Sequence, residues 1–239
     1  MSQRFVLYDN ANSPFGQRVR IALREANVEY TSFEVDTANK PAWFVEKINP
    51  IGKVPAILYG GPDVPPDQPS PDSVKLAESH IIAEFIADLY PDSGLMPRDP
   101  VQRAHVHRFV DIVNTKFTPE IIPWFVTGAS WQGIVDALVA LQDLLPDDAA
   151  FAVGGSLTLA DVAFVPLYSM FWIMCEKGLC LAEAARPRDV AEIVNGPELA
   201  KLKAYVDGLL VRPSIKAAVD QERQEKYLRK FVAGAHRHD

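Results

Sequence analysis

The chain has 239 residues, of which 48% are apolar, and a formal net charge of −7. This length allows one large domain or two small ones, and the negative charge argues against a nucleic-acid-binding surface. The N-terminus does not resemble a signal peptide, and no apolar stretch is expected to reach the length of a membrane span. Two cysteines, Cys175 and Cys180, give neither a disulfide framework nor a metal-binding spacing, which favours a reducing, cytoplasmic setting.

A strand, a short polar loop and a helix start follow one another near the N-terminus. The apolar run at residues 5–8 predicts the strand, and the apolar residues within 19–23 predict the helix. Ser13 is a good N-cap, and Pro14 fits the first helical position. The first turn of such a helix presents unpaired backbone N–H groups and the positive end of a dipole, so it can stabilise an anion such as a thiolate. The alternative is ordinary helix capping.

Two further segments of the N-terminal third carry candidate binding groups. Residues 30–35 predict a second strand, and a short helix is expected to begin at Pro41, with Lys40 just before it. Residues 49–59 predict a turn and then a strand that Pro55 opens. If the Val54–Pro55 bond is cis, the backbone N–H and C=O of Val54 are exposed and can bind a peptide ligand as an added strand would. Lys40 could equally be a surface lysine, and Val-Pro only a strand start.

A proline-rich loop at residues 60–71 is expected to join this strand to a partner strand at 73–77. A helix follows, with an apolar stripe over residues 81–89, and Glu78 and Ser79 lie at its N-terminus. A carboxylate and a hydroxyl there can bind an ammonium and a carboxylate together, or they can merely cap the helix. The order β-α-β-α-β-β-α predicts an α/β domain with a thioredoxin-like sheet over residues 1–91.

A linker rich in proline follows at residues 92–100, and an all-helical domain is expected over 101–239. Pro119 and Pro123 are expected to kink or break the helix that precedes them. Thr158 and Asp161 have the spacing of a capping box that fixes a buried helix start. Aromatic residues at helical spacing are mostly core, but a minority could line a groove for a flat apolar ligand. The candidate pocket residues are Phe117, Ile121, Trp124, Tyr168 and Trp172.

Together, these motifs resemble the cytosolic glutathione transferases over nearly the whole chain. The residues that carry the resemblance are Ser13-Pro14-Phe15, Val54-Pro55, Glu78-Ser79 and Thr158-x-x-Asp161, in this order. Residues 39–44 and 49–55 resemble the omega class, which usually has cysteine at the position of Ser13. The serine form resembles a branch of omega-like transferases in wood-decay fungi. The resemblance implies a homodimer that uses glutathione as co-substrate and holds no metal.

The resemblance also implies a role for each motif residue. The catalytic residue would be Ser13, and the glutathione-binding residues would be Phe15, Lys40, Val54, Pro55, Glu78 and Ser79. Ser13 would donate a hydrogen bond to the glutathione sulfur, and Lys40 would approach the glycyl carboxylate. Val54 would pair backbone to backbone with the cysteinyl unit. Glu78 and Ser79 would hold the γ-glutamyl amino and carboxylate groups.

Serine at position 13 favours conjugation over disulfide chemistry. A free thiol has a pKa of about 8.5, which a helix N-terminus can lower by one to several units, so glutathione would be held as a nucleophilic thiolate. A cysteine would instead form a mixed disulfide, so thiol transferase, dehydroascorbate reductase and deglutathionylation activities are not expected. We expect transfer of glutathione to electrophilic, aromatic substrates. The alternatives are ligandin-type binding of phenolic or apolar compounds with low turnover, and glutathione-dependent ether cleavage. The expected partners are glutathione and an apolar or aromatic small molecule, with no nucleic acid and no membrane.

Overall fold

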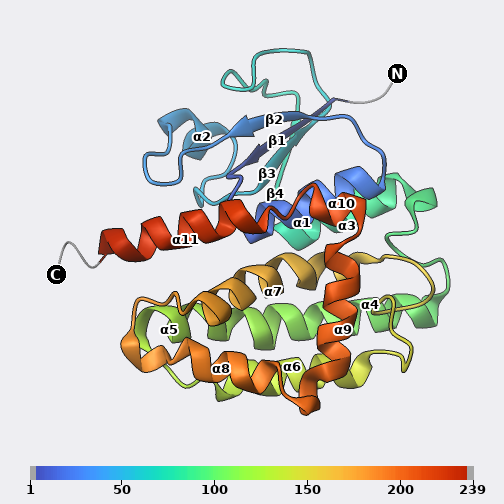
Figure 1. Cartoon of the computed structure of the whole chain (residues 1–239). Helices are drawn as coiled ribbons and strands as arrows, with labels where there is room; N and C mark the ends of the chain where they lie inside the picture. The colour runs from blue at the N-terminus through green and yellow to red at the C-terminus, as the bar shows by residue number, and fades with distance from the viewer. Residues whose placement is uncertain (1–3, 236–239) are drawn as a thin grey trace. The chain divides into compact units, whose positions relative to one another are not determined.

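The computed structural model describes residues 4–235 of the chain (Figure 1). The chain divides into two compact units, Met1–Leu95 and Met96–Asp239. The first unit has the order β-α-β-α-β-β-α that the sequence predicts, and the second is helical. Each unit is described separately below.

A four-stranded mixed sheet forms the centre of the first unit. Its strands are β1 (Phe5–Asp9), β2 (Thr31–Glu34), β3 (Ala56–Tyr59) and β4 (Val74–Ala77), in the spatial order β2-β1-β3-β4. β1 pairs in parallel with β2, whereas β1 with β3 and β3 with β4 pair antiparallel. The parallel pair joined through a helix and the following antiparallel hairpin confirm the predicted thioredoxin-like fold.

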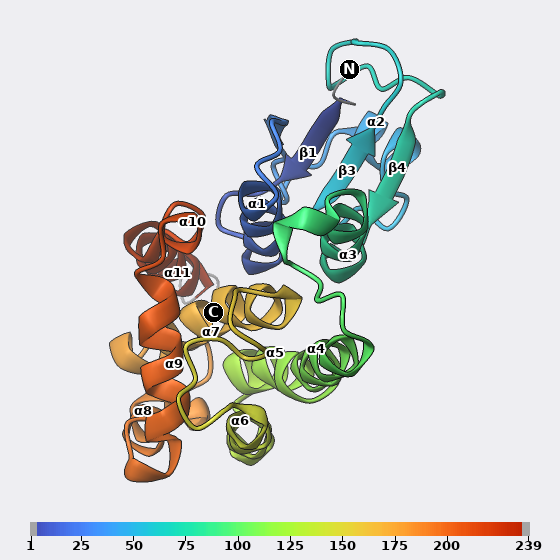
Figure 2. The ribbon, with the colours of Figure 1, turned by 90° about the vertical axis from the view of Figure 1, so that its right-hand side faces the viewer.

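Helices cover both faces of this sheet, as Figure 2 shows. The helices are α1 (Pro14–Glu25), α2 (Ala42–Lys47) and α3 (Ser79–Leu89). On one face Val6 and Tyr8 of β1 form a core with Phe44 of α2. Side chains alternate along a strand, so Leu7 and Asp9 lie on the opposite face. α1 and α3 pack against each other on that face.

The proline-rich loop between β3 and β4 is attached to the sheet by two side chains of the first strand region. Arg4 donates hydrogen bonds to the carbonyl oxygens of Pro62 and Val64, and its Nε lies 3.2 Å from a carboxylate oxygen of Asp63. The Tyr8 hydroxyl donates to the carbonyl of Pro66 over 2.7 Å. Burial raises the pKa of Tyr8 to about 12, so this hydroxyl keeps its proton at neutral pH. The loop is therefore a hairpin connection with fixed contacts.

The second unit consists of helices of very different lengths. They are α4 (Pro100–Ile112), α5 (Thr118–Thr127), α6 (Gln132–Leu144), α7 (Leu159–Lys177), α8 (Pro187–Val194), α9 (Ala200–Leu210), α10 (Pro213–Lys216) and α11 (Gln221–Ala235). α11 packs against α7, where Ser169 Oγ donates to the buried Gln224 over 3.1 Å. The sequence shows only a mixed-charge tail at this helix.

The expected helix break at Pro119 and Pro123 is wrong. α4 continues through a π-helical turn, Val113–Phe117, directly into α5. The wider i→i+5 turn directs both the backbone N–H and the hydroxyl of Thr118 to the carbonyl of Val113. Pro119 then falls in the first turn of α5, where its missing N–H costs little. Pro123 lies inside α5, and its carbonyl accepts a hydrogen bond from the Thr127 hydroxyl.

The predicted capping box at the start of α7 is confirmed. Thr158 Oγ1 accepts from the N–H of Ala160, and Asp161 accepts from the N–H of Thr158. The buried Asp161 carboxylate also accepts hydrogen bonds from the N–H of Ala152 and the hydroxyl of Tyr205. Burial raises the pKa of Asp161, and these donors oppose that rise.

α7 corrects one expectation from the sequence, because its length and apolar composition are sufficient to cross a membrane. It has 19 residues and a mean hydropathy of 1.4 over its most apolar window. However, 89% of that window is buried inside the structure. A helix that is apolar on every side and buried by its neighbours is the central helix of a packed domain.

Candidate functional site

The N-terminus of α1 has the cap that the sequence predicts. Ser13 is the N-cap, Pro14 occupies the first turn, and Ser13 Oγ accepts a hydrogen bond from the N–H of Gly16 over 3.2 Å. The hydroxyl of Ser13 has one proton, which is not used in this cap and can be donated to a ligand. Phe15 is exposed beside it. The site thus combines a positive helix end with a hydroxyl donor.

The N-terminus of α3 has an unusual backbone. Glu78 precedes the helix with φ +70° and ψ 112°, and its side chain makes no capping hydrogen bond. A non-glycine residue rarely adopts a positive φ, and such residues are concentrated at functional sites. Glu78 is exposed, whereas Ser79 is buried. Ordinary capping therefore does not explain Glu78.

Arg18 connects the two helix starts, and the sequence analysis missed it. Its buried guanidinium donates to Ser79 Oγ over 3.2 Å and lies 5.4 Å from the ring centre of Phe15. Burial lowers the pKa of Arg18 to about 9, so it remains charged at neutral pH. The available signal is a charged residue within the apolar face of α1 beside Val19.

The segment before β3 is a turn organised by Asn49. Its amide donates to the carbonyl of Lys53 over 2.8 Å, and its carbonyl oxygen accepts from the N–H of Ile51. Gly52 has φ +70°, and a methyl group placed on it would lie 3.9 Å from Lys40 Nζ. The exposed Lys40 ammonium therefore lies over this turn.

The Val54–Pro55 peptide bond is cis, which confirms that prediction. The β-ladder on both sides of β3 begins at Ala56, so the backbone of Val54 lies outside it. Val54 is half-buried and Pro55 is buried.

The register of the sheet brings the predicted groups to one edge. Tyr8 pairs with Ala56, and Ala56 pairs with Ala77. The end of β1, the start of β3 and the end of β4 therefore lie side by side. Three segments leave the sheet at this edge: the loop to Ser13, the Val54–Pro55 turn, and the Glu78–Ser79 helix start. Groups separated by up to 66 positions in sequence thus converge on one edge of the sheet.

A charged layer supports the loop that leads to Ser13. Arg20 donates to the carbonyl of Ala11 over 3.0 Å, and the Glu34 carboxylate accepts from the N–H of the same residue over 3.1 Å. Arg20 Nε also lies 3.5 Å from a carboxylate oxygen of Asp9. The sequence analysis did not identify any of these side chains.

The structure places most of the candidate pocket residues in the core of the helical unit. Phe117 and Trp124 have no exposed surface, and Trp124 Nε1 donates to the carbonyl of Ala185 over 2.8 Å. Ile121 and Tyr168 are also buried, whereas Trp172 is half-buried. Of the five candidates, Trp172 has the surface most suited to ligand contact.

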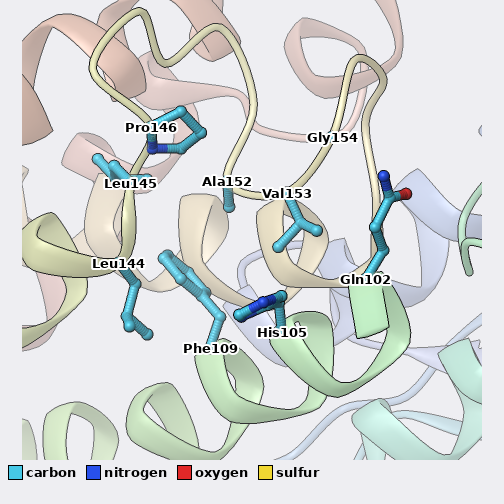
Figure 3. Close-up of a pocket in the computed structure, with 9 residues that line it drawn as sticks. All are labelled: Gln102, His105, Phe109, Leu144, Leu145, Pro146, Ala152, Val153 and Gly154. Carbon is cyan, nitrogen blue, oxygen red and sulfur yellow. The ribbon is translucent and has the colours of Figure 1, made fainter. Parts of the chain in front are cut away.

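A pocket of about 280 Å³ opens in the helical unit, away from these residues in sequence. Its lining residues come from α4, the end of α6 and the loop before α7: Gln102, His105, Phe109, Leu144, Leu145, Pro146, Ala152, Val153 and Gly154. Figure 3 shows His105 and Phe109 lying opposite Ala152 and Val153. The lining is mainly apolar, and an imidazole and an amide supply its polar groups.

Within residues 4–235, no three His, Cys, Asp or Glu side chains come together as a metal site. Burial raises the pKa of Cys175 well above its usual value and that of Cys180 to about 12. Both thiols are therefore protonated at neutral pH and are poor nucleophiles.

Comparison with known proteins agrees with this geometry. Residues 12–89 match the family model for the glutathione S-transferase N-terminal domain. Glutathione S-transferase U22 of Arabidopsis thaliana is 31% identical over 178 residues, which cover 72% of this chain and 75% of that protein. The crystal structure of glutathione transferase Omega 1C from Trametes versicolor has a TM-score of 0.92 and 39% identity, and 98% of each chain is covered. Omega 2S from the same fungus, in complex with 2,4-dihydroxybenzophenone, has a TM-score of 0.88, 33% identity and coverage of 96% and 100%.

The chain belongs to the glutathione transferase family and is a glutathione transferase enzyme. Within that family, its closely matching structures are omega-class enzymes of a wood-decay fungus.

Proposed function

We propose that this transferase holds glutathione at the N-terminus of α1 as a thiolate and transfers it to electrophilic aromatic substrates. The observation that supports this best is the convergence of Ser13, Val54 and the Glu78–Ser79 helix start on one sheet edge. These groups offer a sulfur donor, a backbone pair and a charged terminus for one extended peptide.

The chemistry at the sulfur follows from the cap of α1. Ser13 Oγ accepts from Gly16, so its own proton can be donated to the thiolate. The helix dipole and this hydrogen bond both favour the charged sulfur and lower its pKa. The thiolate then uses an electron pair to form a bond to an electrophilic carbon. Where that carbon carries a leaving group, the group departs with its bonding electrons.

The remaining groups fix the peptide. Ser79 and Glu78 would take the γ-glutamyl carboxylate and ammonium, and the buried Arg18 adds positive charge behind Ser79. The Val54 backbone, which lies outside the ladder, would pair with the cysteinyl unit. Lys40 would approach the glycyl carboxylate, and Phe15 would lie beside the sulfur.

The aromatic substrate class is supported by a relative and by one side chain. Omega 2S of Trametes versicolor was crystallised with 2,4-dihydroxybenzophenone, a two-ring phenolic compound. Trp172 of this chain keeps exposed surface on the helix that carries most of the aromatic core. We further propose that the enzyme is cytoplasmic and dimeric, as the family resemblance implies.

Assays with three substrate groups test the proposal. Purified protein is given glutathione with a model aryl halide, with a panel of β-aryl ethers, and with a small mixed disulfide. We expect aryl conjugation and little disulfide reduction. Release of phenol from the ethers, with slow aryl conjugation, would replace conjugation by ether cleavage.

A second function, non-catalytic storage of phenolic compounds, is favoured by the pocket beside α4. Its volume of about 280 Å³ lies at the small end of ligand sites, which suits a compound with one aromatic ring. Phe109 and Val153 supply apolar walls, and His105 and Gln102 can hydrogen-bond a phenolic hydroxyl. Binding of a one-ring phenol measured by calorimetry, with and without glutathione, tests this function separately from turnover.

A further inference from the structure

A buried carboxyl group lies directly beneath the first turn of α1. Asp9 ends β1 and is only 2% exposed. A methyl group placed on Gly16 would lie 1.7 Å from Asp9 Oδ1 and 2.2 Å from its Cγ. The carboxyl therefore rests against the backbone of Gly16, the residue whose N–H donates to Ser13 Oγ. Any side chain at position 16 would displace it.

This carboxyl group has little compensation for its burial. Neither Asp9 oxygen accepts a hydrogen bond of good geometry, and Arg20 Nε, 3.5 Å away, also lacks one. Buried polar groups are nearly always hydrogen-bonded, and each exception needs an explanation. The capping and folding of α1 do not need a carboxylate here, because Ser13 already caps the helix.

We propose that Asp9 is a positioning residue of the glutathione site, whose charge controls how strongly the start of α1 stabilises the thiolate. The proposal rests on the proposed function, because it needs a thiolate at Ser13. When Asp9 is ionised, its negative charge opposes the helix dipole and the thiolate. When Asp9 is protonated, the helix end acts on the thiolate without that opposition. Asp9 does not touch the sulfur and acts through the first turn of α1.

The charges around Asp9 place its titration in the working range of the enzyme. Burial raises the pKa of Asp9 to about 7, and Glu34 on the neighbouring β2 adds to that rise. Arg20 on α1 and the N–H of Asn10 act in the opposite direction. β3, which pairs with β1 on its other side, has no acidic or basic residue in its span. Asp9 is therefore partly protonated near neutral pH.

Binding linkage makes the proposal testable from both ends. If the thiolate raises the pKa of Asp9, then ionised Asp9 must raise the pKa of the bound thiol by the same amount. For two charges several ångströms apart in a partly buried site, the expected shift is about one pKa unit. Glutathione and S-methylglutathione share every group except the ionisable thiol, so the difference between them isolates this coupling.

The first experiment titrates the bound thiol by its thiolate absorbance in wild type, Asp9→Asn and Glu34→Gln. Asparagine has the shape of aspartate but no charge, so Asp9→Asn should lower the thiol pKa by about one unit. Glu34→Gln removes an equal charge near the same loop, but that charge is exposed to solvent, so the thiol pKa should change much less. Equal pKa values in wild type and Asp9→Asn would overturn the proposal.

The second experiment uses unmodified protein and does not depend on a variant that folds. The Asp9 carboxyl is titrated by carbon NMR in the presence of glutathione or of S-methylglutathione. We expect a pKa about one unit higher with glutathione; no difference between the two ligands would overturn the coupling. Calorimetry of wild type with both ligands shows whether the glutathione site exists. If neither binds, the proposed function fails and this inference fails with it.

Discussion

Arg18 on α1 donates a hydrogen bond to Ser79 Oγ on α3, over 3.2 Å and across 61 positions of sequence. The contact is buried, and it fixes the distance between the two helix starts that are proposed to hold opposite ends of glutathione. A guanidinium behind Ser79 also makes that helix start more attractive for a carboxylate.

Replacing Ser79 tests this anion-binding end. Ser79→Ala removes a donor to the γ-glutamyl carboxylate, and a hydrogen bond to a charged group contributes about 1.5–3 kcal/mol. We expect glutathione to bind roughly 10- to 100-fold more weakly by calorimetry. His80→Ala, at the exposed next residue, is the matched control and should bind as wild type does. Equal affinity of both variants would remove Ser79 from the site.

Glu78 is expected to lower stability in exchange for function. A residue held at φ +70° costs about 1–3 kcal/mol, and glycine relieves that strain while adding up to about 1 kcal/mol of unfolded-state entropy. Glu78→Gly should therefore raise the free energy of unfolding by about 1 kcal/mol and weaken glutathione binding. Urea unfolding and calorimetry on the same sample check both. A variant that is less stable and binds normally would contradict the assignment.

Ser13 is expected to control the chemistry more than the binding. Ser13→Ala should cost about 1 kcal/mol of stability as a lost N-cap and leave glutathione affinity almost unchanged. The thiolate loses a hydrogen bond, so its pKa should rise and aryl conjugation at neutral pH should fall. Ser13→Cys should lose conjugation and gain reduction of a mixed disulfide. If Ser13→Ala conjugates as fast as wild type at every pH, the backbone alone holds the thiolate.

Asp9 also predicts a pH dependence of stability. The folded-state pKa of about 7 lies above the usual value of 3.8, so the folded state binds the proton more tightly than the unfolded state. The contribution of Asp9 to stability is therefore complete below about pH 4 and is lost as the pH rises to about 7. Asp9→Asn should be more stable than wild type at pH 8, by up to about 4 kcal/mol, and this advantage should shrink towards pH 4. Urea unfolding at four pH values measures it, and an advantage independent of pH would contradict the assigned pKa.

The pocket beside α4 can be closed without altering the glutathione site. His105 is exposed at its edge, so His105→Trp should fill it and reduce binding of a fluorescent apolar probe at least 10-fold. His107→Trp places the same side chain two positions along α4, outside the lining, and should bind the probe normally. Aryl conjugation should be the same in both variants. Unchanged probe affinity in His105→Trp would place the ligand elsewhere.

The parts of the site that the sequence predicts are those with local causes. A serine before a proline at a helix start, a proline that opens a strand and a Thr-x-x-Asp box each act on neighbouring backbone. The strand order then brings these local signals together. Because they need no distant partner to be recognised, a single chain is sufficient to identify them.

The parts that the sequence misses depend on contacts between distant residues. The periodicity of α1 shows that Arg18 lies on an inner face, but not that Ser79 accepts its hydrogen bond. Asp9 reads as the polar end of an apolar strand until Gly16 is placed against it. The pocket needs three segments that only the packing of the helices brings together. The break expected at Pro119 is wrong because a wider helical turn upstream was not predicted.

That π-helical turn, Val113–Phe117, also determines which side of α5 is buried. One additional residue in a helix rotates everything downstream by about 100°, since an α-helix has 3.6 residues per turn. With the turn in place, Trp124 is fully buried, and Ile122 and Val126 are 63% and 45% exposed. Deleting a single codon within the turn would restore an uninterrupted α-helix and exchange these faces. The outer surface of α5 is therefore a product of reading phase, which one insertion or deletion can rewrite without changing any residue of α5 itself.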